Sequence, residues 1–258
     1  MSKRLLTILS IILISLFAEN ALAENYFVVE KNSRSVHHSS SQPNPNEIDG
    51  LPKPILKAAI NAYLYAIKQN DVRNLSMLTI VDFNKPSYEK RLWVIDLHNK
   101  HIIMNIHVAQ GRNSGKIYPT HFSNDPNSHE SSLGIFTTYG QEYHGAFGKS
   151  LHVRGLESDI NSNALSRGIV IHSEWDITPK FIRTMGYAGR TWGCFAVNPD
   201  HINRIIELLQ DDSVLFVYAS PEKEDPLVAH PLSSEGEKLY QEIIQTNSNP
   251  LVRFFETF

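Results

Sequence analysis

Apolar side chains recur along this chain with two different spacings, and each spacing predicts a different kind of element. Residues 53–70 carry a stripe of apolar positions three or four apart, which is typical of an amphipathic helix docked on another surface. From residue 77 the apolar runs become short and rich in β-branched and aromatic side chains, as in strands. The pattern therefore predicts a mainly β fold with a few helices packed on it. We expect strands at 77–83, 91–97, 101–109, 134–139, 150–154, 168–172, 194–197 and 213–218.

Two segments in the second half combine a capping residue with a proline, a pairing that is common at helix starts. Thr178-Pro179 predicts a short helix that ends near Met185, and Asn198-Pro199 predicts a helix with an apolar stripe along 202–209. A further helix is expected around 234–245. The polar segments 110–133 and 155–166 are predicted to be long loops, where proteins built on β scaffolds often carry functional residues.

The first 23 residues have the three parts of a secretory signal peptide. Lys3 and Arg4 supply the positive charge, an almost unbroken apolar run covers 5–18, and Ala21-Leu22-Ala23 is a small-residue cleavage pattern. The apolar run is shorter than the roughly 20 residues that cross a bilayer as a helix. We therefore expect cleavage after Ala23, export to the periplasm, and no stable membrane insertion of the mature chain.

Composition and charge narrow the function further. The chain has 258 residues, 41% of them hydrophobic, a formal charge of −3 and one cysteine. This composition is globular, and the charge gives no electrostatic reason to expect a nucleic-acid partner. A single cysteine excludes an intramolecular disulfide and a multi-cysteine metal site. His37-His38 lies in the polar linker, and His98 and His101 lie on a predicted hairpin without a carboxylate pattern, so we expect no metal and no cofactor. The predicted organisation is a signal peptide (1–23), a polar linker (24–50), a domain that includes the first helix (51–220) and a C-terminal extension (221–258).

His172 and Cys194 are the candidate reactive pair. His172 ends an apolar strand, and Cys194 follows the turn-prone run Gly189-Arg190-Thr191-Trp192-Gly193. An imidazole that accepts the thiol proton turns the cysteine into a thiolate nucleophile. The resulting ion pair keeps the thiolate reactive at pH values below the pKa of roughly 8.5 of a free thiol. A glycine before the cysteine permits unusual backbone geometry at the site. A structural cysteine that enters an apolar strand is the alternative interpretation.

The order of these residues resembles the L,D-transpeptidase catalytic domain, and in particular its murein branch, whose signature is of the Gly-Arg-Ser-Trp-Gly-Cys type. The resemblance runs from about residue 53 to 220 and rests on Ile171-His172-Ser173, on Gly189 to Cys194, and on five supporting segments. Those segments are 91–97, 111–115, 122–124, 131–134 and 161–164.

The resemblance implies a twisted β-sandwich and acyl transfer on peptidoglycan tetrapeptide stems. Cys194 would attack the carbonyl of the L-centre of meso-diaminopimelate, D-Ala would leave, and an amine would resolve the thioester. His172 would carry the proton, and the Ser173 carbonyl would orient the imidazole. Backbone N–H groups of Gly193 and Cys194 would form the oxyanion hole. The resemblance also implies that carbapenem β-lactams acylate the thiol.

Three residues of the turn are candidates for substrate binding, and two positions depart from the larger family. That family usually has His before Gly-Cys and Arg two places after the Cys, whereas Trp192 and Ala196 stand there in this chain. Trp192 is compatible with the murein branch, Thr191 keeps the hydroxyl of its Ser, and Arg190 is the candidate cation for a stem carboxylate through a bidentate contact. A solvated Arg190 and a Trp192 that only packs in the core remain alternatives.

Three other functions remain open from the sequence. Water in place of the amine would make the protein an L,D-carboxypeptidase or an amidase, because groove shape and water access choose the acceptor. A non-catalytic wall-binding module with an inert Cys194 is the second alternative, and an unrelated exported cysteine hydrolase is the third.

Overall fold

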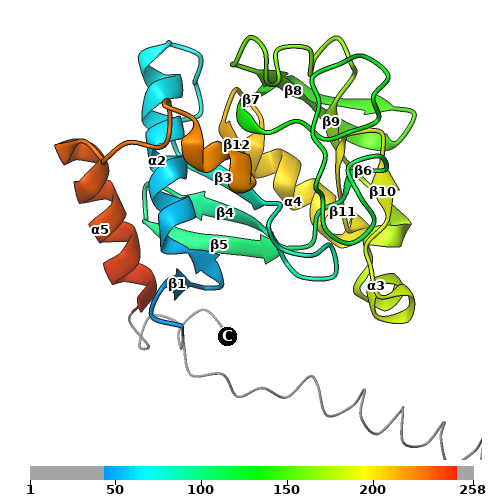
Figure 1. The fold of residues 1–258 in the computed structure, drawn as a ribbon, viewed down its shortest axis with the longest axis horizontal. Helices are drawn as coiled ribbons and strands as arrows, with labels where there is room; N and C mark the ends of the chain where they lie inside the picture. The colour runs from blue at the N-terminus through cyan, green and yellow to red at the C-terminus, as the bar shows by residue number, and fades with distance from the viewer. Residues whose placement is uncertain (1–43, 249–258) are drawn as a thin grey trace, which may run out of the picture. The chain divides into compact units, whose positions relative to one another are not determined.

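An eight-stranded mixed sheet forms the centre of the protein (Figure 1). The structure is a computed structural model, and it describes residues 44–248. The predicted signal peptide and most of the polar linker lie outside the described residues, as do the last ten residues of the C-terminal extension.

The strand order in the sheet is β11-β9-β8-β7-β12-β3-β4-β5. Two pairs, β11 with β9 and β12 with β3, are parallel, and the others are antiparallel. The strands are β3 (Met77–Asp82), β4 (Leu92–Asp96), β5 (His101–Ile106), β7 (Gly134–Gly145), β8 (Gly148–Gly155), β9 (Val170–Ser173), β11 (Phe195–Val197) and β12 (Val214–Tyr218).

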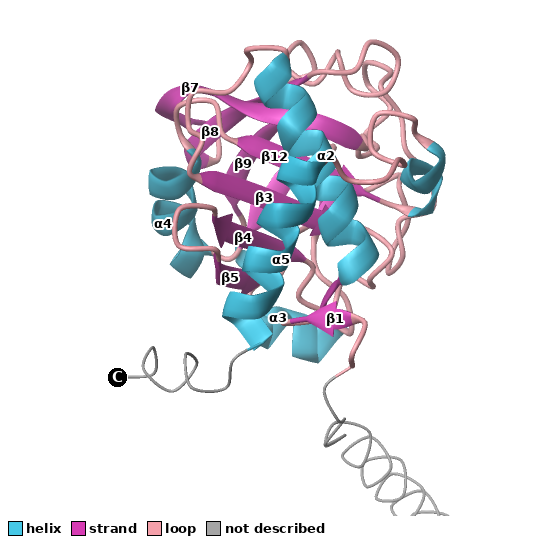
Figure 2. Cartoon of the chain, turned by 90° about the vertical axis from the view of Figure 1, so that its left-hand side faces the viewer, coloured by secondary structure: helices cyan, strands magenta, loops and turns pink. Residues whose placement is uncertain are grey.

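Alternation along the strands gives the sheet two apolar faces. Leu78, Ile80 and Trp93 share a core with residues of α2 (Lys53–Lys68) and α5 (Ser234–Ser248). Figure 2 shows these two helices over one face of the sheet. The intervening Val81 and Val94 point to the other face. That second face is concave, because its core joins strands from both ends of the sheet with α4 (Pro199–Leu209).

The mainly β fold predicted from the sequence is confirmed. The expected sandwich arises from one sheet that curls until β8, β9 and β11 face β3 and β4 across a shared core. The capped helices are confirmed as well. Thr178 Oγ1 accepts the Phe181 N–H at the start of α3 (Pro179–Met185), and Asn198 Oδ1 accepts the Asp200 N–H at the start of α4. Gly186, at φ 76°, ends α3 in the left-handed region.

The structure differs from the expected strands mainly around the loops. β7 runs six residues beyond the expected end at Tyr139, and with β8 it forms a long hairpin whose outer part is polar. Two short strands, β6 (Gln110–Gly111) and β10 (Arg190–Thr191), pair in parallel inside segments without periodicity. A two-residue hairpin, β1 (Glu47–Ile48) with β2 (Leu51–Pro52), precedes α2.

Short 3-10 turns complete the fold: η1 (Trp175–Ile177) precedes α3, and η2 (Ser220–Glu224) follows β12. Within residues 44–248, none of the helices combines the length and the apolar character needed to cross a membrane.

Candidate active site

The parallel strands β9 and β11 bring the candidate pair to one end of the sheet. His172 pairs with Ala196, and Cys194 directly precedes β11. Extending this register by two residues places Cys194 beside Val170. Strand spacing then puts the Cα atoms of His172 and Cys194 on the order of 8 Å apart, on the same side of the two strands. The topology therefore joins two residues that are distant in the sequence.

The Cys194 thiol is nearly enclosed, with 8% of the residue exposed. Its Sγ lies 3.8 Å from the Gly168 carbonyl oxygen and also accepts the backbone N–H of Val170. Burial raises the pKa of Cys194, and the Val170 N–H and the positive charge of Arg167 oppose that rise.

His172 is still more enclosed, at 1% exposed. Its Nδ1 lies 3.2 Å from the Ser173 carbonyl oxygen and 3.9 Å from Glu174 Oε1. A carbonyl can only accept, so this contact assigns the proton to Nδ1 and leaves Nε2 as the basic nitrogen. Burial lowers the pKa of His172, while the Ser173 carbonyl and the charge of Asp176 act in the opposite direction.

The directions of these two shifts favour an uncharged pair over the ion pair that the sequence led us to expect. A raised thiol pKa and a lowered imidazole pKa both favour the uncharged forms. Within the described residues, the thiol hydrogen bonds to Gly168 rather than to His172. Desolvation is the largest influence on both groups, so burial favours a neutral thiol and a neutral imidazole in the free protein.

The turn before Cys194 is held by the hydroxyl of Thr191. Its Oγ1 donates to the Cys194 carbonyl oxygen at 2.8 Å and accepts the Gly193 N–H at 3.1 Å. Gly193 has φ 114°, and a Cβ there would lie 2.7 Å from the Glu130 carbonyl oxygen, so only glycine fits. The Gly193 N–H, which the resemblance implies for the oxyanion hole, is thus occupied by Thr191 in this structure.

Arg190 and Trp192 are both exposed, in contrast to the buried pair. Arg190 Nη1 donates to the Arg112 carbonyl oxygen at 3.2 Å, which ties β10 to the segment after β6. Trp192 is 64% exposed and stacks on His129 with ring centroids 4.5 Å apart, so it does not pack in the core. Together with His129 and Arg167 it lines a pocket of about 160 Å³.

Arg167 is a site residue that the sequence reasoning missed. Its guanidinium holds the loop opposite the turn, and a Cβ at Gly193 would lie only 3.1 Å from its Nη2. The sequence gives no signal for Arg167, because it is a single arginine in a polar segment and belongs to no motif. Its acceptors are the carbonyl oxygens of Ser123 (2.7 Å) and Glu130 (2.6 Å) and the hydroxyls of Ser132 (2.7 Å) and Ser128 (3.2 Å).

The tip of the β7–β8 hairpin covers the pair. Phe147 stacks on the His172 ring with centroids 4.5 Å apart, although 52% of Phe147 is exposed. Tyr143 stacks on His152 at 4.3 Å, and its pKa is raised by burial and by the proximity of Cys194. A substrate that reaches the thiol must therefore pass beneath or displace this tip.

The comparisons with known proteins assign the family. A family model described as the L,D-transpeptidase catalytic domain matches residues 47–218, more than half of the chain. The chain belongs to this family, and the resemblance seen in its motifs is confirmed. A comparison with curated protein sequences found no match.

Solved structures of L,D-transpeptidases are similar to this chain at low identity. An enzyme from Mycobacterium smegmatis is 13% identical with a TM-score of 0.35, over 56% of this chain and 59% of that one. An L,D-transpeptidase in complex with imipenem is 12% identical with a TM-score of 0.34, over 55% and 59% of the two chains. One from Xylanimonas cellulosilytica is 11% identical with a TM-score of 0.32, over 63% and 78%. The chain thus spans 59% of the length of the first two.

Proposed function

We propose that this protein is an exported, cysteine-dependent L,D-transpeptidase that acts on peptidoglycan tetrapeptide stems. The observation that carries the proposal is the parallel pairing of β9 with β11, which brings His172 and Cys194 to one end of the sheet. Family membership supports the substrate class. The N-terminal charge, apolar run and Ala21-Leu22-Ala23 pattern support export to the periplasm with cleavage after Ala23.

In the proposed acylation step, the Cys194 Sγ attacks the carbonyl carbon of the L-centre of meso-diaminopimelate as its proton passes to Nε2 of His172. The Ser173 carbonyl, bonded to Nδ1–H, stabilises the imidazolium that forms. The tetrahedral intermediate collapses to a thioester, and the amine of D-Ala leaves with the proton from His172. A neutral Cys194 and a neutral His172 in the free protein suit this order of steps, because charge develops only once the substrate is in place.

The resolving step reverses these roles. An amine of a neighbouring stem attacks the thioester carbonyl, His172 takes its proton, and the thiol is restored. The oxyanion in both steps would accept backbone N–H bonds from Cys194 and Gly193. Because the Gly193 N–H is bonded to Thr191 Oγ1, it has to exchange that partner when the oxyanion forms.

The exposed residues of the turn have distinct proposed roles in binding. Arg190 would pair with a stem carboxylate, since its guanidinium has one bond to a carbonyl and other donors that face solvent. Trp192 and its stacked partner His129 would form one wall of the stem-binding pocket. Thr191 would act through the turn and not through the substrate, because its hydroxyl is committed on both sides.

The test is incubation of the purified protein with tetrapeptide muropeptides. We expect release of D-Ala and a mass increase on Cys194 equal to the acyl tripeptide, both absent from Cys194→Ser. A cross-linked dimer as product supports transfer, whereas a tripeptide alone supports the carboxypeptidase alternative. Imipenem is expected to add its own mass to Cys194, as the family resemblance implies. No D-Ala release and no adduct would refute the proposal.

One observation favours a non-catalytic wall-binding module as the second candidate. Cys194 is 8% exposed and its pKa is raised, as for a structural thiol. This candidate predicts that Cys194→Ala changes neither the fold nor the effect of the protein on the cell wall. A muropeptide digest of cells that produce Cys194→Ala separates the two candidates directly.

A further inference from the structure

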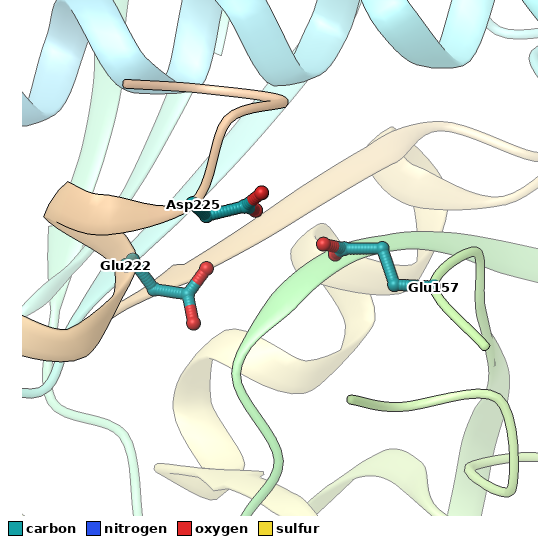
Figure 3. A group of neighbouring side chains, drawn as sticks. All are labelled: Glu157, Glu222 and Asp225. Atoms are coloured by element: carbon teal, nitrogen blue, oxygen red, sulfur yellow. The ribbon is translucent and has the colours of Figure 1, made fainter. Parts of the chain in front are cut away.

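Three buried carboxylates meet at a place distinct from the Cys194 site. Glu157 follows β8, Glu222 belongs to η2, and Asp225 comes directly after η2. Figure 3 shows the three side chains pointing toward one another, and one oxygen from each lies within 4.8 Å of the other two. Glu157 and Glu222 are only 5% and 4% exposed.

The inward oxygens of this group meet no backbone or basic donor within residues 44–248, and only a proton shared between Glu157 and Asp225 could link them. These oxygens are Glu157 Oε1, Glu222 Oε2 and Asp225 Oδ2. No ion pair of the described part of the chain includes these residues. A buried carboxylate without a partner is costly, so the arrangement calls for a positive ligand.

Backbone groups hold two of the carboxylates in position by their other oxygen. Glu157 Oε2 accepts the Ile135 N–H, and Asp225 Oδ1 accepts the Leu227 N–H at 2.9 Å. A Cβ at Gly134 would lie 2.1 Å from Glu157 Oε2, so the glycine leaves room for this carboxylate. Each anchored carboxylate thus directs a free oxygen toward Glu222.

We propose that Glu157, Glu222 and Asp225 bind one divalent cation, for which Ca²⁺ is the best fit. Carboxylate oxygens are the ligands that hard cations prefer, and Ca²⁺ tolerates irregular geometry with six to eight oxygens. Waters complete the shell from an adjoining pocket of about 460 Å³, lined by Glu222 and Asp225 and by Ser123 and Asn124. The cation joins the segment after β8 to the segment after β12 and so stabilises the fold.

The test compares thermal unfolding of the purified protein in EDTA with unfolding in rising CaCl₂. A ligand that binds only the folded state at about 100-fold its dissociation constant raises the melting temperature of a domain of this size by about 5–10 °C. We expect that shift in the wild type and its loss in Glu222→Gln. The matched control is Glu224→Gln, because Glu224 is exposed on η2 and lines the same pocket outside the cluster. The control should keep the full shift.

Equilibrium dialysis provides a second measurement, with one Ca²⁺ expected per wild-type chain and none for Asp225→Asn. Asparagine Oδ1 can still accept the Leu227 N–H, so this variant keeps its backbone contact. An equal shift in Glu222→Gln would overturn the proposal. So would the absence of a shift and of bound Ca²⁺, which would mean that protons shared among the carboxylates take the place of the ion. Neither readout requires muropeptide chemistry, so each outcome is independent of the proposed transpeptidase activity.

Discussion

At the scale of single residues, burial decides the protonation of both candidate catalytic groups. Cys194 and His172 are enclosed by the concave core and by the hairpin tip, and desolvation is the largest influence on each pKa. Arg167, the one cation that acts on the thiol, is committed to the loop it holds. The proposed mechanism therefore relies on proton transfer during attack and not on a standing ion pair.

The alkylation profile of Cys194 measures this directly. We expect the pH midpoint of iodoacetamide alkylation to lie above about 8.5, because burial raises the pKa of the thiol. His172→Ala should leave that midpoint above about 8.5, because burial is the largest influence on the thiol pKa, yet it should abolish D-Ala release. A wild-type midpoint at a pH well below 8.5 that rises in His172→Ala would instead support the thiolate–imidazolium ion pair.

Thr191 provides a second prediction at this scale. Thr191→Val removes the hydroxyl that bonds Gly193 N–H and the Cys194 carbonyl, and the loss of two partly buried hydrogen bonds is expected to cost about 1–2 kcal/mol of unfolding free energy. D-Ala release should fall with it, because the turn that carries the nucleophile loosens. Thr191→Ser keeps the hydroxyl and should keep both properties. Urea unfolding and a muropeptide assay check this, and an unaffected Thr191→Val would remove Thr191 from the site.

Asp82 shows how burial sets stability against pH. It is 2% exposed at the end of β3, and burial raises its pKa to about 6. An unfolded Asp titrates near 3.9, so the folded state binds more protons between these values and stability falls as pH rises through them. Above about pH 7, ionisation of Asp82 lowers the free energy of unfolding by up to roughly 3 kcal/mol.

Asp82→Asn should therefore stabilise the protein at pH 7.5 and have little effect at pH 4, as measured by urea unfolding at both values. The asparagine oxygen can still accept the Asn84 N–H that Asp82 binds. Equal effects of the substitution at the two pH values would show that Asp82 titrates normally in the folded protein.

At the scale of elements, the β7–β8 hairpin lies over the candidate pair. Its outer part is polar and largely exposed, and Phe147 and Tyr143 connect it to the site. A segment with so few buried apolar contacts opens at low cost. If a peptide stem reaches Cys194 as proposed, we expect this hairpin to move.

Phe147→Ala tests that role. Removing the ring exposes His172, so its pKa should rise toward about 6.5, as followed by NMR titration of the imidazole. Stability should change by less than about 1 kcal/mol, because Phe147 is half-exposed. Tyr139→Ala is the control on the same hairpin, since Tyr139 stacks under Arg154 and not on His172. An unshifted His172 would show that the sheet alone buries the ring.

The sequence predicts elements well where local chemistry defines them. Thr178-Pro179 and Asn198-Pro199 mark their helices because cap and proline act within one turn. The outer half of β7 lacks apolar alternation, and β6 and β10 are too short for any period. The motif around Cys194 identifies the family, yet it carries no sign of the Thr191 bonds or of Phe147 on His172. Glu157 and Asp225 are 68 residues apart, so only the fold reveals their cluster.

At the scale of the whole molecule, the segment after β12 is part of the same body as the sheet. The described residues from Pro45 to Ser248 group as one compact unit, and Tyr240 and Ile243 of α5 are buried in the core that covers the sheet face under α2. Asn247 Oδ1 accepts the N–H of Ile102 at 2.9 Å, and its Nδ2 donates to the Lys100 carbonyl at 2.7 Å. The expected C-terminal extension thus closes one edge of the sheet.

Ile243→Ala measures how strongly α5 stabilises the whole fold. The side chain is completely buried, so its truncation should cost about 2–4 kcal/mol of unfolding free energy through lost transfer energy and a residual cavity. Because α5 shares a core with the sheet, unfolding should remain one cooperative transition with a lower urea midpoint and an unchanged slope. Gln241→Ala, at an exposed position two residues earlier, should change stability by no more than about 0.5 kcal/mol. Two separate transitions in Ile243→Ala would instead show that α5 folds independently of the sheet.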